Sequence, residues 1–154
     1  MSKRLAIDAN LLVLLIVGQV SRSLIGKHKR LRAYSEVDFD LLTKIRTGFS
    51  SMVVTPNTST ETSNLIAYGV NGPLRMRLMA ALGLFLRSAK ELYQPSSVVS
   101  ERGEFMRLGL TDAALLSVLD EQSVLLTDDN ALFVAAVNSG RKAYLFSIVR
   151  NHAT

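Results

Sequence analysis

Acidic residues recur at the ends of predicted secondary-structure elements, although they are far apart in the chain. Asp8 follows a short apolar run, Glu61 and Asp112 lie early in predicted helices, and Asp128 and Asp129 follow a second apolar run. In an open α/β sheet the carboxyl ends of the strands line the ligand crevice, so these side chains are predicted to gather there. Carboxylates in one crevice repel one another unless a divalent cation lies among them. The pattern therefore predicts a metal-dependent hydrolase.

Each acidic residue also has a purely structural explanation. Asp8 could cap a helix that begins near Ala9, and Thr58-Ser59-Thr60-Glu61 fits a capping box. Asp112 and the pair Asp128-Asp129 lie in first helical turns, where the helix dipole favours negative charge. Helix capping does not require an acid at the crevice end of so many elements, so the joint pattern favours a functional site.

The residue types that the chain lacks restrict the kind of metal site. There is no cysteine and there are only two histidines, which excludes a thiolate site and argues against an imidazole-rich zinc site. Oxygen ligands remain, and they predict Mg²⁺ or Mn²⁺. Asn10 and Thr127 are predicted to orient water or ligands around the ion. For Asn10, a role as a turn residue at the helix start is an equal alternative.

The chain combines its acidic motifs with a basic background, since the formal net charge is +5 and the sequence pI is about 9.8. Such a background attracts polyanions, so RNA is the predicted partner, although the same charge also serves solubility. A basic insert at about residues 21–33 carries the predicted RNA-binding side chains, Lys27, Lys29, Arg30 and Arg32. The insert could instead contact an acidic protein or form a solvated loop. His28 is predicted to lie at the surface, and Tyr34 could stack on a base.

Strands and helices are predicted to alternate along the chain. Strands are expected at 5–7, 52–55, 124–127 and 143–146, with 98–99 as a brief strand or a linker. Helices are expected at 9–20, 37–46, 57–68, 74–86 with a continuation to about 90, 101–108, 111–119 and 131–138, and a polar tail follows the last strand. This alternation predicts an α/β fold, a three-layer α/β/α sandwich with a central parallel sheet of four to five strands, in a single domain over residues 1–150.

Hydrophobic patterning argues against a membrane protein and favours an oligomer. The apolar N-terminal stretch is interrupted by Asp8 and Asn10, and its unbroken part, Leu11–Val17, is too short to span a bilayer. A cytoplasmic protein is the expectation. The helix at 74–86 is apolar around most of its circumference, and 48% hydrophobic residues is a high content for a small monomer, so we expect a homodimer.

Four short motifs, taken in order, resemble those of the PIN-domain family. They are Ile7-Asp8-Ala9-Asn10, Val54-Thr55-Pro56 with Thr60-Glu61, Leu108-Gly109-Leu110-Thr111-Asp112-Ala113, and Leu125-Leu126-Thr127-Asp128-Asp129. In the family pattern one residue separates the threonine of the fourth motif from its acid, which selects Asp129 and keeps Asp128 in reserve. The basic insert departs from the pattern, because compact members have a shorter connection there.

The resemblance implies an endoribonuclease that uses Mg²⁺ or Mn²⁺, similar to the VapC-like toxins of bacterial toxin–antitoxin pairs, with an antitoxin protein as a potential partner. Asp8 and Asp112 would bind the metal directly, and Glu61 and Asp129 directly or through water. One alternative is a PIN-like module without catalysis that binds RNA or protein, although acids at all four motif positions argue against it. Another is an unrelated α/β fold such as a receiver-like domain, which would cluster its acids early in the chain.

Overall fold

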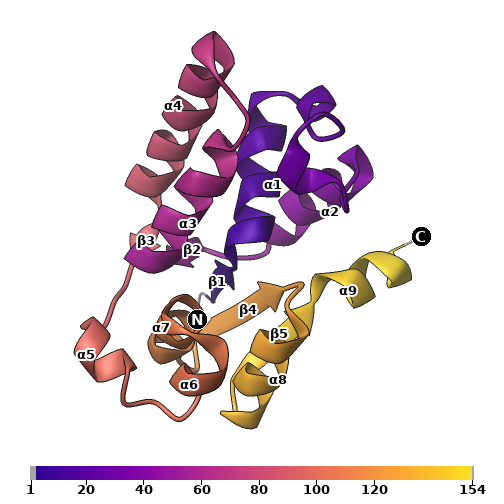
Figure 1. The fold of residues 1–154 in the computed structure, drawn as a ribbon. Helices are drawn as coiled ribbons and strands as arrows, with labels where there is room; N and C mark the ends of the chain where they lie inside the picture. The colour runs from indigo at the N-terminus through magenta and orange to yellow at the C-terminus, as the bar shows by residue number, and fades with distance from the viewer. Residues whose placement is uncertain (1–2, 154) are drawn as a thin grey trace.

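A parallel β-sheet organises the chain in the computed structural model, which describes residues 3–153 (Figure 1). Its strands are β1 Arg4–Ile7, β2 Ser51–Val54, β3 Lys90–Glu91, β4 Ser123–Thr127 and β5 Lys142–Leu145. They are hydrogen-bonded in the order β3-β2-β1-β4-β5, and every pair is parallel. The predicted α/β class, with a parallel sheet of four to five strands, is confirmed.

Helices fill the connections between the strands. The α-helices are α1 Ala9–Val20, α2 Glu36–Arg46, α3 Pro56–Ala67, α4 Gly72–Ser88, α5 Ser96–Val99, α6 Phe105–Leu108, α7 Leu110–Val118, α8 Asn130–Asn138 and α9 Phe146–His152. Two short 3₁₀ helices, η1 Arg22–Leu24 and η2 Lys29–Leu31, lie within the basic insert. Parallel strands need such crossover connections, because a tight turn joins only antiparallel neighbours.

Two apolar clusters cover the two faces of the sheet and make the three layers. Successive side chains of a strand point to opposite faces, so Ile7 of β1 joins one cluster and Ala6 joins the other. The first cluster packs α1, α2 and α4 on the sheet, and the second packs α7 and α8 on it. Because both faces are covered, the central strands are apolar along their length.

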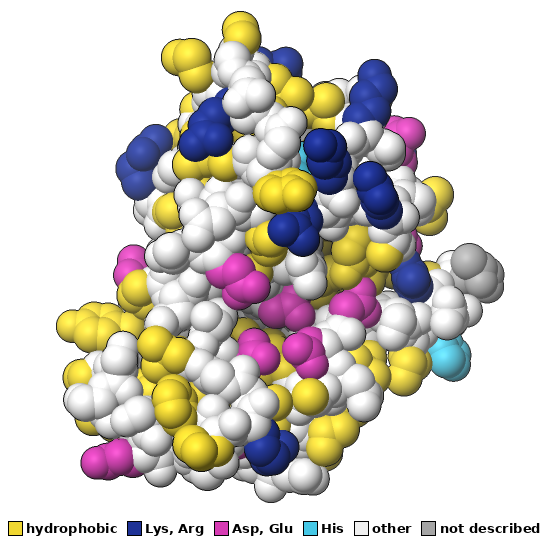
Figure 2. Space-filling view, in the orientation of Figure 1, with side chains coloured by type: hydrophobic (Ala, Val, Ile, Leu, Met, Phe, Trp, Pro, Cys, Tyr) yellow, Lys and Arg dark blue, Asp and Glu magenta, His cyan; other side chains and the backbone are white. Residues whose placement is uncertain are grey.

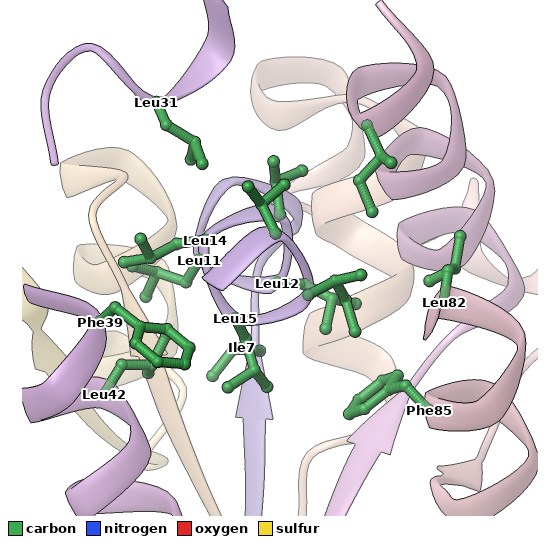
Figure 3. Close-up of a cluster of buried hydrophobic side chains, with 14 of the residues drawn as sticks. Ile7, Leu11, Leu12, Leu14, Leu15, Leu31, Phe39, Leu42, Leu82 and Phe85 are labelled. Atoms are coloured by element: carbon green, nitrogen blue, oxygen red, sulfur yellow. The ribbon is translucent and has the colours of Figure 1, made fainter. Parts of the chain in front are cut away.

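Helix α1 lies inside the first cluster and is buried nearly all round. Figure 3 shows Leu14 on the side of α1 that faces Phe39 of α2, and Leu12 on the side that faces Leu82 of α4. The continuous apolar run near the N-terminus is therefore the sequence of a central core helix. None of the helices within residues 3–153 is long and apolar enough to cross a bilayer.

The structure corrects several predicted element boundaries. The helix predicted to continue to about residue 90 ends at Ser88, and β3 follows it as a short exposed edge strand paired with β2. Residues 98–99 belong to a helical turn and form neither a strand nor a linker. The helix expected at 101–108 covers only 105–108. The expected polar tail is helix α9, which the fully buried Phe146 anchors in the core.

Candidate functional site

The strand order contains a topological switch point between β1 and β4. From β1 the chain continues to β2 on one side, and β4 pairs with β1 on the other side, so the crossover connections diverge at this place. Ligand crevices of open α/β sheets lie outside the carboxyl ends of the strands at such points. Asp8 comes directly after β1, and Asp128 and Asp129 come directly after β4. Figure 2 shows acidic side chains gathered across the middle of one face, between α1 and α3 above and α7 and α8 below.

Asp8 is held in place by two hydrogen bonds. Its Oδ1 accepts from the backbone N–H of Leu11 at 3.3 Å, so the predicted N-cap of α1 is confirmed. Its Oδ2 accepts from the hydroxyl of Thr127, the last residue of β4. Burial raises the pKa of Asp8 to about 6, against the lowering effect of these two hydrogen bonds, and the charge of Asp128 raises it further. The carboxylate is thus firmly oriented, and its negative charge is costly.

Asp112 projects from the first turn of α7 and is the least compensated acid of the site. No donor within residues 3–153 forms a hydrogen bond with its carboxylate. Burial raises its pKa to about 6, and the charges of Asp129, Asp8 and Glu61 add to this rise. Asp8, Glu61, Asp112 and Asp129 therefore lie close enough for their charges to interact, as expected from their positions in the sequence.

The two consecutive aspartates after β4 have different surroundings. Asp128 accepts hydrogen bonds at both oxygens, from the Tyr34 hydroxyl at 2.6 Å and from the backbone N–H of Ser147 at 2.8 Å. Asp129 caps α8 by accepting from the backbone N–H of Leu132 at 3.1 Å, and it stays exposed. Asp128 thus ties β4 to distant segments, whereas the charge of Asp129 acts on Asp112 and raises its pKa.

Thr127 joins two of the acids through a single hydroxyl. Its Oγ1 donates to Asp8 and accepts from the backbone N–H of Asp129 at 2.9 Å. The side chain is fully buried, which fixes the positions of both neighbours. The other residue predicted to orient ligands, Asn10, is exposed in the first turn of α1 and forms no hydrogen bond with the described residues.

Glu61 lies in a different helical position from the one predicted. Helix α3 starts at Pro56 and is capped by Thr55, whose hydroxyl accepts from the backbone N–H of Thr58 at 3.0 Å. The capping box predicted over residues 58–61 is therefore wrong, because proline is favourable in the first turn and moves the helix start upstream. Glu61 lies in the second turn with an exposed side chain and lines a cleft of about 410 Å³ with Asn64.

The acids have the chemical type of ligand that a divalent cation prefers, but their side chains lie farther apart than the ligands of a single bound ion. Carboxylate oxygens suit Mg²⁺ and Mn²⁺. Burial, and then the charges of neighbouring acids, raise the pKa values of Asp8 and Asp112, and a bound cation would compensate these charges. Of the residues that the structure describes, no three Asp, Glu or His side chains lie close enough together to hold one ion.

The basic insert is folded against the core, in contrast to a solvated loop. Its four predicted RNA-binding side chains are exposed: Lys27, Lys29, Arg30 and Arg32. His28, which was predicted at the surface, is only 7% exposed, and its Nε2 lies 3.0 Å from the carbonyl oxygen of Ile66 in α3. That prediction was wrong because it was based on the charged neighbours of His28 in the sequence, whereas its hydrogen-bond partner lies in a helix far along the chain.

Base stacking was one option that the sequence left open for Tyr34, and the structure shows internal contacts for this side chain. Its hydroxyl donates to Asp128, and its ring lies 6.2 Å from the ring of Phe146 between centroids. Arg150 of α9 lies over the same ring and forms an ion pair with Asp38 at 3.1 Å. No local sequence signal predicts these contacts, since the partners are about a hundred residues apart along the chain.

No protein-family model matches this chain, and a comparison with curated proteins gives no match.

Proposed function

We propose that this chain is a divalent-metal-dependent endoribonuclease of the PIN-like type, which uses Mg²⁺ or Mn²⁺ to hydrolyse RNA phosphodiester bonds. The observation that carries the proposal is Asp112, whose carboxylate accepts no hydrogen bond from residues 3–153 and lies near the charges of Asp129, Asp8 and Glu61 at the switch point of the sheet. Such an arrangement is unfavourable for the isolated fold, and bound cations would make it favourable. The strand order β3-β2-β1-β4-β5 is compatible with a PIN-like topology.

In this proposal Asp8 and Asp112 hold the ion, and Glu61 and Asp129 bind it directly or through water. A bound ion of this kind supplies a hydroxide at neutral pH and stabilises charge on the phosphoryl oxygens. The chain contributes orientation, because the Thr127 hydroxyl fixes both Asp8 and the backbone of Asp129. The exposed cations of the insert would draw RNA towards the acids.

The proposed setting is a cytoplasmic toxin with an antitoxin protein as its partner. The proposal includes a homodimer, in which the exposed apolar side chains of α4, Met76 and Leu84, would be covered; they are 73% and 65% exposed in the single chain. Association of that kind would remove apolar surface from water.

RNA cleavage with matched variants tests the proposed activity. Wild-type protein is expected to cleave RNA with Mg²⁺ or Mn²⁺, and Asp112→Asn and Asp8→Asn are expected to lose this cleavage while still folding. Asparagine is a good N-cap residue, so Asp8→Asn preserves the start of α1. Asp120→Asn is the control, because Asp120 lies at the opposite end of the sheet from the acids. Its carboxylate forms an ion pair with the Arg4 guanidinium at 2.6 Å. If the wild type and the two site variants behave alike on every RNA and metal tried, the nuclease proposal fails.

Thermal unfolding with added Mn²⁺ gives an independent measurement. An ion that binds only the folded protein raises the melting temperature by mass action. The rise is expected for wild type and Asp120→Asn and not for Asp112→Asn. An equal rise in all three proteins would exclude Asp112 as a ligand.

A further inference from the structure

Tyr68 is an exposed aromatic residue that carries two cationic side chains on its ring. It directly follows α3 and is 52% exposed. The guanidinium of Arg30 lies 4.4 Å from the ring centroid, and the Lys29 ammonium lies 6.0 Å from it. An aromatic face combined with basic groups is the combination that proteins use to bind single-stranded nucleic acid.

Hydrogen bonds of the buried His28 side chain fix the backbone that carries these cations. The Nδ1 of His28 accepts from the backbone N–H of Arg30 at 3.1 Å, so Nε2 carries the proton and donates to the carbonyl oxygen of Ile66 at 3.0 Å. Ile66 lies two residues before Tyr68, and Leu31 anchors the other end of the same turn in the core. The buried contact of His28 with α3 therefore holds this part of the insert beside Tyr68. The proximity of Lys29 and Arg30 to the ring follows from this internal contact.

Tyr68 lies on the same face of α3 as the acid Glu61. Seven residues separate the two, which corresponds to nearly two full turns and a distance of about 10 Å along the helix axis. Asn64 lies between them on this face and lines the same cleft as Glu61 and Thr111 of α7. Glu61, Asn64 and Tyr68 thus follow one another along this side of the helix, from the acids towards the Tyr68 ring.

We propose that Tyr68, with Arg30 and Lys29, binds one unpaired nucleotide of a single-stranded RNA whose scissile phosphate lies at the acids. The base packs on the face of the Tyr68 ring opposite the Arg30 guanidinium, and the two cations contact the flanking phosphates. Only an unpaired base exposes its face for stacking, so the platform selects single strands over duplexes. Tyr68 is a positioning residue in this scheme, and the inference rests on the proposed nuclease function for the place of the scissile bond.

Fluorescence anisotropy with a labelled oligouridylate in EDTA tests the platform without cleavage. Tyr68→Ala is expected to weaken binding about 5- to 150-fold, the range found when a stacking side chain is truncated. Tyr68→Phe keeps the ring and is expected to bind like wild type, whereas Tyr68→Leu should behave like Tyr68→Ala. Tyr144→Ala is the control, because Tyr144 is 55% exposed on the edge strand β5 and should leave binding unchanged. Binding of duplex RNA should not respond to Tyr68→Ala.

Cleavage kinetics separate this inference from the nuclease proposal. With Mg²⁺ or Mn²⁺, Tyr68→Ala is expected to raise KM and to leave kcat near the wild-type value, since the acids are untouched. If the wild type cleaves RNA and Tyr68→Ala binds and cleaves equally well, the proposed nucleotide-binding role of Tyr68 is refuted and the proposed nuclease activity is supported. If oligouridylate binding depends on the Tyr68 ring and no cleavage occurs, the proposed nucleotide-binding role of Tyr68 is supported and the proposed nuclease activity is refuted. Equal weakening by Tyr68→Ala and Tyr68→Phe would also overturn the stacking role.

Discussion

Replacing Asp112 with asparagine should stabilise the metal-free protein. The Asp112 carboxylate is partly buried, accepts no hydrogen bond from the described residues and feels three nearby acids. Asparagine keeps the shape of the side chain and removes the charge. Residues that build a functional site commonly lower the stability of the fold, so a gain of stability upon neutralisation is the signature of a site residue.

The sign and size of the effect follow from the pKa of Asp112. Its pKa is raised from 3.8 to about 6, so the folded state binds more protons than the unfolded state between these two values. The free energy of unfolding therefore falls as the pH rises through this window. The full difference corresponds to about 3 kcal/mol, and contact of the side chain with water reduces our expectation to about 1–2 kcal/mol at neutral pH. For a chain of this size that is a rise in melting temperature of about 2–8 °C.

Urea unfolding in EDTA at several values from about pH 4 to about pH 8 measures this effect. Wild type should lose stability between about pH 4 and pH 6, and Asp112→Asn should show a smaller loss. Asp120→Asn is the matched control with the opposite sign. Burial alone would raise the pKa of Asp120, but hydrogen bonds from Gln122 and Ser123 and the charge of Arg4 lower it, so removing its charge should destabilise the protein. An Asp112→Asn variant that is less stable than wild type at neutral pH, without metal, would refute the reasoning.

Three further substitutions test the contacts that support the site. Thr127→Val removes the hydroxyl that donates to Asp8 and should cost about 1–3 kcal/mol in urea unfolding, whereas Thr127→Ser should retain most of the stability. His28→Leu leaves a buried carbonyl of α3 without its donor and should cost a similar amount, about 1–3 kcal/mol; unchanged stability would show that the insert is not attached there. Gly18→Ala should destabilise the fold by about 1–3 kcal/mol in the same assay, because its Cβ would lie 2.2 Å from the ring of Phe39, and a neutral result would contradict the packing of α1 on α2.

The strand framework and the gathering of the acids follow from local sequence. Apolar runs punctuated by polar residues predicted β1, β2, β4 and β5 to within a residue or so of their bounds. Strands β1, β2 and β4 are apolar because they are covered on both faces, whereas β5 is a partly exposed edge strand. The runs at 5–7 and 124–127 are followed by acids and the run at 52–55 by a helix start, and the carboxyl ends of parallel strands share one edge. Asp8 and Asp129 were therefore predicted at a common crevice before their positions were known. Strand β3 escaped prediction, since two exposed edge residues carry no apolar pattern.

The sequence by itself determined the fold class, and it predicted the gathering of the acids and oxygen ligands for a metal, all of which depend on residue type and near-neighbour spacing. Only the tertiary structure decided what each side chain contacts. It engages Asp128 with Tyr34 and Ser147, and it buries His28 against α3. Among the described residues, it gives Asp112 no hydrogen-bond donor. These outcomes depend on contacts between segments distant in the chain, and the free energy of a polar side chain is set by the partners and burial that such contacts provide.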